Sequence, residues 1–291
     1  HSEAAAEAFR RLTAPFMLRR LKSDKSIIAD LPERNTIDQF TNLTAEQAAL
    51  YSKVLEEHMA KLKKLDAKAA ADPTGNDAKT AHRGQVLRLI TSMKQICNSP
   101  SQYLKTEAAT PDSGKAAALF DILGRCREAS RKVLIFTQYR EMGERLQTWI
   151  EKATGERPDF LHGGVSVKAR QDMVDRFQTD RSVHSMIISL KAGGTGLNLT
   201  AASCVVHYDL WWNPAVEAQA TDRAYRIGQR RDVLVYRFVT AGTFEERINE
   251  MLTEKQSLAD LTVTTGETWI GDLSSSELQS LFSLDPKSVS G

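Results

Sequence analysis

Short apolar runs alternate with amphipathic helical patterns between residues 115 and 240, and this alternation limits the fold more than any other feature of the sequence. The stretches between the runs repeat their apolar residues at helical spacing. Such a pattern is typical of β-α-β units, which predict an α/β fold with a parallel sheet and helices on both faces. The expected strands are 133–136, 160–162, 186–189, 205–208 and 234–238.

Polar motifs stand at the carboxyl ends of these expected strands. Gln138 and Tyr139 follow the first strand, and His162 ends the second. A glycine-rich turn at 191–198 follows the third strand, and the segment 209–213 follows the fourth. Because ligands of parallel sheets bind beyond the carboxyl ends of the strands, we expect these motifs to line one functional edge.

The stretch 189–229 is the richest in such motifs. Its glycines, Gly193, Gly194 and Gly196, allow a tight turn and a close approach of the backbone to a ligand. Asn213 followed by Pro214 predicts the start of a helix, because an asparagine caps the first turn and a proline is suited to its first position.

This last helix is expected to have an apolar and a polar face. The apolar stripe would consist of Val216, Ala220, Ala224 and Ile227, and the polar stripe of Gln219, Arg223, Arg226 and Arg230. Three guanidinium groups on one face repel each other unless an anion lies between them, and their planar forks suit phosphate oxygens. The alternative is a surface ion pair between Asp222 and Arg226, which are four residues apart.

Three motifs in this stretch, GGTGLNL, DLWWNP and QATDRAYRIGQ, occur in the order and at the close spacing of a known family. They resemble the second RecA-like lobe of the Swi/Snf-type ATPases of helicase superfamily two, which are double-stranded-DNA translocases and remodelers. The resemblance extends more weakly over nearly the whole chain. It implies a RecA-like parallel sheet with an inserted helical hairpin and a C-terminal helical extension.

The resemblance also implies roles for particular residues. Arg223 and Arg226 match the family arginines that reach the nucleotide phosphates, with Arg226 expected at the γ-phosphate. The other residues expected near the nucleotide are Gly194, Gly196, Asn198, Gln219 and Asp222. The residues expected near DNA are Gln138, Tyr139, His162, Ser189, Lys191, Trp212 and Asn213. Trp211, beside Trp212, is expected in the core instead.

The sequence contains at most half of an ATPase site. It has neither a phosphate-binding loop of the form G-x-x-x-x-G-K-[ST] nor a D-E-x-x motif after an apolar strand. ATP with Mg²⁺ is therefore expected to bind mainly to a first RecA-like lobe of the same protein, with no metal site in this chain. We expect this chain, which starts at His1 instead of Met, to be a fragment without ATPase activity of its own.

Four segments are expected along the chain. They are a connector from the first lobe (1–40), a helical protrusion (41–112), the RecA-like lobe (113–242) and a C-terminal helical extension (243–291). Capping-box patterns at Thr44–Gln47 and Thr243–Glu246 predict the starts of two of the helices.

The charge of the chain is unevenly distributed. Residues 1–240 contain 36 basic and 28 acidic residues, a net charge of +8, whereas residues 241–291 contain 3 and 9, a net charge of −6. A basic body favours a polyanionic partner, although solvated surface charge is the alternative. The expected partners are double-stranded DNA, contacted through its backbone, and a DNA-bound protein such as RNA polymerase.

The three cysteines are far apart and each lies in an apolar run, which indicates reduced core thiols and not a disulfide framework or a metal site. They are Cys97, Cys126 and Cys204. No stretch is apolar enough to predict a membrane span. The ending WIGDLSSSELQSLFSL resembles bacterial members of the family, so the bacterial cytosol is the expected location, or the nucleus if the source were eukaryotic.

Three alternatives stay open at this point. A non-catalytic nucleic-acid-binding or scaffold module would share the basic body. An RNA-directed helicase lobe is disfavoured, because such proteins usually end the last motif in arginine where this chain has Gln229. A methyltransferase or dehydrogenase is disfavoured, because the first strand is followed by TQYREMG and not by a glycine fingerprint.

Overall fold

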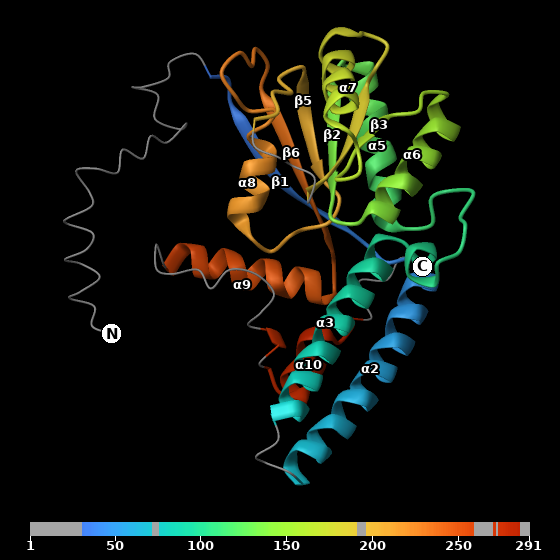
Figure 1. Cartoon of the computed structure of the whole chain (residues 1–291), viewed down its shortest axis with the longest axis vertical. Coiled ribbons are helices and arrows are strands. Elements are labelled where there is room, and N and C mark those ends of the chain that lie inside the picture. The colour runs from blue at the N-terminus through green and yellow to red at the C-terminus, as the bar shows by residue number, and fades with distance from the viewer. Residues whose placement is uncertain (1–30, 72–75, 191–195, 259–269, 272, 286–291) are drawn as a thin grey trace, which may run out of the picture.

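The computed structural model describes residues 31–71, 76–190, 196–258, 270–271 and 273–285 (Figure 1). One all-parallel sheet of six strands forms the centre, in the order β1-β6-β5-β2-β4-β3. The strands are β1 (Arg34–Thr41), β2 (Lys132–Thr137), β3 (Asp159–Leu161), β4 (Ser185–Ser189), β5 (Ala202–His207) and β6 (Val233–Thr240). The five predicted strands and their parallel pairing are confirmed, whereas the edge strand β1 was not predicted.

Helices cover both faces of the sheet, as predicted. Side chains alternate along β2, so that Val133 and Ile135 pack with α5 (Gly114–Glu128) and α6 (Arg140–Thr154). Leu134 and Phe136 point to the opposite face and pack with α7 (Val167–Thr179) and the segment that contains α8 (Pro214–Thr221). The central strands are therefore buried on both sides, which explains their short continuous apolar runs.

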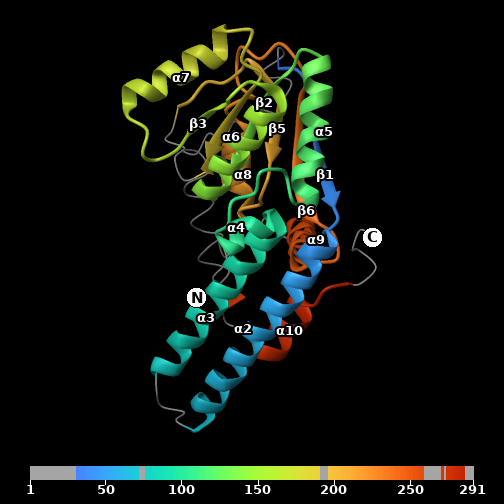
Figure 2. The same ribbon diagram turned by 90° about the vertical axis from the view of Figure 1, so that its right-hand side faces the viewer.

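A helical hairpin projects away from the sheet, as Figures 1 and 2 show. It consists of α2 (Ala45–Ala71) and α3 (Asn76–Asn98), and the short α4 (Pro100–Leu104) follows it. The predicted capping box at its start is confirmed: the Thr44 amide donates to Gln47 Oε1 at 3.1 Å, and the Gln47 amide donates to Thr44 Oγ1 at 3.2 Å.

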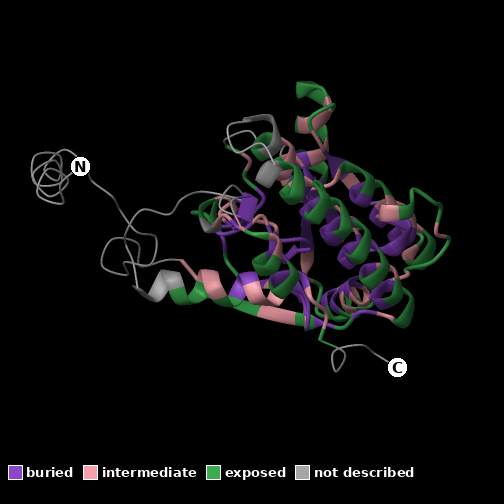
Figure 3. Cartoon of the chain, turned by 90° about the horizontal axis from the view of Figure 1, so that it is seen from below, coloured by how far each residue is buried: buried purple, intermediate pink, exposed green. Residues whose placement is uncertain are grey.

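The C-terminal segment packs onto the base of this hairpin. The Tyr51 hydroxyl of α2 donates to the carbonyl of Phe282, the last residue of α10 (Ser275–Phe282), at 2.8 Å. Seen from below, the residues on the inner faces of these helices are buried and those on the outer faces are exposed (Figure 3). The predicted C-terminal helical extension is thus present, although the domain boundaries themselves stay predictions.

The helix α9 (Phe244–Leu258) begins where predicted, but its capping bonds differ from the predicted box. Thr243 Oγ1 accepts a hydrogen bond from the Glu245 amide at 3.2 Å, and Glu246 Oε2 accepts one from the Gly242 amide at 2.6 Å. In a capping box the donors would be the amides of Glu246 and Thr243. Here each donor is the amide one residue earlier. All three cysteines are buried free thiols, as predicted.

Candidate functional site at the carboxyl edge of the sheet

Asp209, directly after β5, is the centre of a buried network at the carboxyl edge of the sheet. It is fully buried and accepts hydrogen bonds from Thr137 Oγ1 at 2.5 Å and from the Gln138 amide at 2.8 Å. Burial raises the pKa of the Asp209 carboxyl, and the bonds from Thr137 and Gln138 oppose that rise. In the pairing of β2 with β4, Thr137 stands opposite Ser189, so this network brings the predicted residues Gln138 and Ser189 close together.

Gln138 is held in place by two hydrogen bonds to the segment after β5. Besides its amide bond to Asp209, its Nε2 donates to the Leu210 carbonyl at 2.6 Å. Tyr139, the next residue, is half-buried at the start of α6 and its amide donates to Thr137 Oγ1 at 3.3 Å. Ser189 is buried at the end of β4, with 5% of its surface exposed. The backbone around these predicted DNA contacts is thus fixed.

The two adjacent tryptophans differ in burial, and the more buried one is Trp212 instead of Trp211, which was predicted in the core. Trp212 is only 4% exposed, whereas Trp211, predicted in the core, is half-buried. Trp212 has the left-handed backbone conformation, with φ of 58°, and this turns its ring toward the base of the hairpin. There Lys94 Nζ lies 3.6 Å from the ring centroid, and Phe244 meets the ring edge-on at 5.5 Å.

Asn213 caps α8, as predicted, because its Oδ1 accepts a hydrogen bond from the Ala215 amide at 3.1 Å. The helix itself is shorter than predicted, since it ends at Thr221 and the chain continues through turns to Gly228. Ala220 and Ala224 are buried as predicted, but Ile227 is 79% exposed. The predicted apolar stripe is therefore wrong at Ile227, because the chain has left the helix before that residue.

The three arginines do not share one exposed face. Arg223 is only 7% exposed and its guanidinium lies over the Phe136 ring, 5.8 Å from the centroid. Its Nη1 is shielded from solvent and has no hydrogen-bond partner. Burial lowers the pKa of Arg223, and the nearby Arg170 guanidinium lowers it further. Arg226 and Arg230 are exposed, whereas Arg223 is buried. The prediction that the three arginines share one polar stripe is therefore wrong at Arg223.

The glycine-rich turn contacts this arginine segment. The Leu199 amide donates to the Arg223 carbonyl at 2.9 Å, and Arg226 Nη1 donates to the Leu197 carbonyl at 3.3 Å. Gly196 has a φ of 109°, a conformation that favours glycine. Lys191 and Gly194 lie outside the described residues. Of the remaining residues expected near the nucleotide, Asn198 and Gln219 are exposed and Asp222 is half-buried.

Known proteins resemble this chain in both sequence and fold. The family profiles "SNF2-related domain" and "Helicase conserved C-terminal domain" match residues 1–102 and 114–228. The structure of the Sulfolobus solfataricus SWI2/SNF2 ATPase C-terminal domain matches with a TM-score of 0.71 at 33% identity, covering 87% of this chain and 100% of that chain. The chain belongs to the Swi2/Snf2 family. It contains the C-terminal RecA-like lobe, as the sequence motifs predicted.

Two further matches extend this relationship. The Swi2/Snf2 ATPase core of Sulfolobus solfataricus in complex with dsDNA matches with a TM-score of 0.76 at 37% identity, covering 98% of this chain and 57% of that chain. The putative ATP-dependent helicase/translocase YwqA of Bacillus subtilis is 43% identical over 280 residues, which are 94% of this chain and 28% of the relative. The chain thus spans about a quarter of the length of the curated relatives it matches.

His162 stands apart from the other predicted residues of this Swi2/Snf2 lobe. It follows β3 at the end of the sheet, two strands away from β2 in the strand order. Its Nδ1 accepts a hydrogen bond from the Gly164 amide at 3.1 Å, and its ring lies 5.0 Å from that of Phe160. The structure gives His162 a local role in the turn before α7.

The buried polar residues through which this Swi2/Snf2 lobe joins its hairpin to the sheet were not predicted from the sequence. Asn98 at the end of α3 donates to Asp209 Oδ2 at 3.2 Å, and Lys94 donates to the Leu210 carbonyl at 3.3 Å. Lys115 in α5 forms a buried ion pair with Glu245 of α9 at 2.9 Å. The only sequence signal for them was a charged or amide side chain within an apolar helical pattern, which does not identify the partner.

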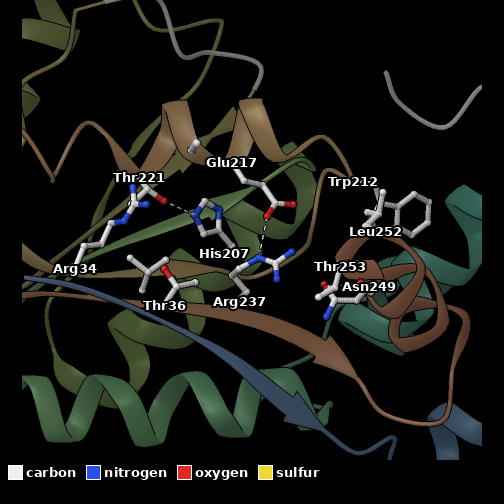
Figure 4. Close-up of a pocket in the computed structure, with 12 residues that line it drawn as sticks. Arg34, Thr36, His207, Trp212, Glu217, Thr221, Arg237, Asn249, Leu252 and Thr253 are labelled. Atoms are coloured by element: carbon white, nitrogen blue, oxygen red, sulfur yellow. Dashed lines mark hydrogen bonds and ion pairs between the residues drawn. The ribbon is translucent and has the colours of Figure 1, made fainter. Parts of the chain in front are cut away.

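A pocket of about 280 Å³ lies between α8, β6 and α9, and the arginines Arg223 and Arg226 are not among its lining residues (Figure 4). In it, Arg237 bridges Glu217 at 2.9 Å and Asp38 at 2.6 Å. His207 Nε2 lies 2.9 Å from Thr221 Oγ1. No cluster of three metal-ligating side chains occurs within the described ranges, and no helix there is long and apolar enough to span a membrane.

Proposed function

We propose that this chain is the second motor lobe of an ATP-dependent double-stranded-DNA translocase. The observation that carries the proposal is the contact between the arginine segment and the glycine-rich turn, through the Arg223 carbonyl and the Arg226 guanidinium. A change at the arginines would move this turn, which follows β4 and Ser189. The proposal is supported by the family's ATP-dependent relatives and by the solved relative in complex with dsDNA.

The arginines suit the phosphates of ATP. Arg223 Nη1 is a buried donor without a partner, and such a donor costs free energy unless an acceptor reaches it. Arg226 is exposed and can move to meet a phosphate offered by a facing lobe. When bound, ATP with Mg²⁺ supplies the triphosphate that is cleaved, and this chain supplies positive charge for the transition state.

The opposite half of the nucleotide site would come from a first RecA-like lobe of the same protein. This chain has no phosphate-binding loop, and it spans about a quarter of the length of the curated relatives that it matches. Both observations support the proposal of a two-lobed protein. Closure of the two lobes around ATP and reopening after hydrolysis would move the pair along one DNA strand. The residues proposed to contact its phosphates are Gln138, Tyr139, His162, Ser189, Lys191, Trp212 and Asn213.

The cellular context is also a proposal. The similarity to the Bacillus subtilis relative supports a bacterial protein that acts on DNA in the cytosol. Its target would be a protein bound to that DNA, such as RNA polymerase. Removal of a DNA-bound protein requires contacts that ignore base sequence, which fits binding through the phosphate backbone.

Replacing Arg226 by alanine in the two-lobed protein tests the arginine finger. The variant should lose roughly 10³-fold or more of the ATPase rate, because the charge that meets the transition state is gone. Its affinity for duplex DNA should stay within about twofold, since Arg226 faces the nucleotide in this proposal. Steady-state ATPase assays and fluorescence anisotropy with a labelled duplex measure the two effects.

Arg230→Ala is the matched control, because Arg230 is also exposed on the same segment and should leave the ATPase rate nearly unchanged. Loss of DNA binding with normal hydrolysis in Arg226→Ala would reverse the assignment. The 291-residue chain alone should not hydrolyse ATP, and turnover by it that Arg226→Ala abolishes would refute the two-lobe proposal. Stronger stimulation by RNA than by duplex DNA would favour an RNA-directed helicase instead.

A further inference from the structure

Tyr225, the residue before Arg226, connects the arginine segment to the part of the chain that enters β1. Its hydroxyl donates a hydrogen bond to the carbonyl of Pro32 at 2.9 Å, although the two residues are 193 positions apart. The guanidinium of Arg34, the first residue of β1, lies over the Tyr225 ring, 5.5 Å from the centroid. Neither β1 nor a role for Tyr225 was predicted from the sequence, so this connection is visible only in the fold.

The Tyr225 ring is part of the core on the α7 and α8 face of the sheet. It is only 9% exposed and belongs to the same cluster as Ala220 and Ala224, against which Leu31 packs. A buried tyrosine usually finds a hydrogen-bond partner for its hydroxyl. Here the partner is a backbone carbonyl just before β1, so the hydroxyl fixes the ring relative to the course of the main chain there.

The backbone of Tyr225 is held from the other side by α8. Its amide donates to the carbonyl of Thr221, the last residue of that helix, at 3.1 Å. Arg226 follows directly, and its Nη1 donates to the Leu197 carbonyl in the glycine-rich turn at 3.3 Å. A shift of Pro32 would therefore move Tyr225 and, through the peptide bond between them, Arg226.

The entry of β1 is joined to β6 directly after Pro32. The Glu33 amide donates to Asp232 Oδ1 at 3.0 Å, and the Glu33 carbonyl accepts from the Val233 amide at 2.9 Å. The register of β1 with β6 begins at the next residue. Pro32 is thus the point at which the predicted connector, 1–40, reaches the sheet, and a change in the direction of the connector would act there first.

We propose that Tyr225 is a positioning residue for Arg226, which sets the place of that arginine according to the position of the β1 entry. This inference rests on the proposed function and adds to it a means of regulating the same site. In the two-lobed protein, the position of the first lobe reaches Arg226 by way of the connector, Pro32 and Tyr225. The competing explanation is that Tyr225 only fills the core.

Replacing Tyr225 by phenylalanine in the two-lobed protein removes the hydroxyl and keeps the buried ring. The kcat for ATP should fall roughly fivefold, the factor that one neutral hydrogen bond supports. The KM for ATP should change less than about twofold, because a misplaced arginine finger weakens the transition state and not the binding of ATP. Steady-state ATPase assays at saturating duplex DNA give both constants.

Tyr236→Phe is the matched control. It removes the same hydroxyl from a half-buried tyrosine of β6 whose ring packs on the opposite face of the sheet, with α5 and α6. Both kinetic constants should stay within about twofold of the wild type in this variant, since a role in packing alone leaves them unchanged.

A double variant separates positioning from packing. If Tyr225 acts through Arg226, adding Tyr225→Phe to Arg226→Ala should not lower the residual hydrolysis further, so the two effects are not additive. A side chain that only stabilises the fold would lower the rate by the same factor in both backgrounds. Single-turnover assays with excess protein measure the residual rate, and equal factors in the two backgrounds would overturn the proposal.

Arg34→Met tests the same connection from an exposed position, where a substitution does not disturb the core. Methionine removes the charge over the Tyr225 ring, and kcat should fall roughly twofold, in line with an exposed cation–π contact. This fall should also disappear when Arg226 is already alanine. A wild-type kcat in both Arg34→Met and Tyr225→Phe would refute the link between the β1 entry and Arg226.

Failure of this inference is distinguishable from failure of the proposed function. If Tyr225→Phe hydrolyses ATP like the wild type while Arg226→Ala does not, the motor function holds and only the positioning role is wrong. If Arg226→Ala itself hydrolyses ATP normally, the proposed function is wrong, and the positioning of Arg226 is wrong with it.

Discussion

Trp212 shows how much of a residue's role is set by contacts that its neighbours in sequence do not reveal. Two adjacent tryptophans give no indication of which is buried, because either can turn inward. The left-handed backbone at Trp212 costs roughly 1 kcal/mol or more in a residue other than glycine. Burial against Phe244 and the contact with Lys94 offset that cost, and both partners are more than 30 residues away in sequence.

His207 should make the stability of the chain depend on pH. Its burial lowers its pKa to about 4, whereas an unfolded histidine has a pKa near 6.5. Between these values the unfolded chain binds a proton that the folded chain excludes, so stability falls as the pH drops from about 6.5 to about 4. The loss attributable to His207 is about 2 to 3 kcal/mol at pH 4.5.

Urea unfolding at pH 7 and pH 4.5 measures this loss, with His207→Phe as the variant. Phenylalanine keeps the stacking on Phe136, whose ring centroid lies 5.4 Å from that of His207. The variant should lose less stability on acidification than the wild type, although His58, whose pKa burial also lowers, keeps part of the dependence. An identical pH dependence in both proteins would contradict the assignment.

At the scale of elements, the sequence predicted the buried strands and missed the edge strand. The five predicted strands have apolar runs because helices cover both of their faces. β1 consists of the residues RNTIDQFT and is mostly exposed, so it lacks both an apolar run and an alternation. Only its pairing with β6 makes it a strand, and that pairing joins residues about 200 positions apart.

The arginine segment after α8 was predicted as a continuous helix for a related reason. Its spacing of three and four residues fits a helix through Arg230, but the helix ends at Thr221. A hydrogen bond from the Leu199 amide to the Arg223 carbonyl replaces the helical pattern there. The motifs therefore predicted that the arginine segment and the turn before it lie at the same edge of the sheet, whereas the orientation of Arg223 depends on tertiary contacts.

Two glycines of α5 should respond in opposite ways to alanine. A Cβ at Gly114 would lie 2.0 Å from the carbonyl oxygen of Asn42, a backbone atom that cannot turn away, whereas a Cβ at Gly124 meets nothing within 4 Å. Gly114→Ala should destabilise the chain by roughly 1 to 3 kcal/mol through overpacking. Gly124→Ala should stabilise it by roughly 0.5 to 1 kcal/mol, because alanine is the better helix former.

Urea midpoints of the two variants against the wild type measure these effects. The same substitution in the same helix controls for the change in helix propensity, so the difference isolates the contact between the start of α5 and Asn42. Midpoints that shift in the same direction would show that this contact can relax, and that the start of α5 is not fixed against the segment before α2.

At the scale of the whole molecule, the hairpin and the sheet act as one unit through a buried polar network. Asn98 and Lys94 from α3 bond to Asp209 and Leu210, and Gln138 bonds to the same two residues from the other side. Lys94 also lies on the ring of Trp212. The base of the hairpin is therefore connected to two of the segments that contain proposed DNA contacts, the one with Gln138 and the one with Trp212.

Breaking this connection should uncouple DNA binding from hydrolysis in the two-lobed protein. Lys94→Met keeps the length of the side chain but removes the bond to Leu210 and the charge over Trp212, which loosens the segment before Asn213. The stimulation of ATPase activity by duplex DNA should fall roughly tenfold, within the range of ordinary coupling energies, and the DNA-independent rate should change less than about twofold. ATPase assays at saturating and zero DNA give both rates, with Thr91→Ala on the exposed side of α3 as the control. If both rates fell together in Lys94→Met, the network would serve stability alone, because a coupling element changes their ratio.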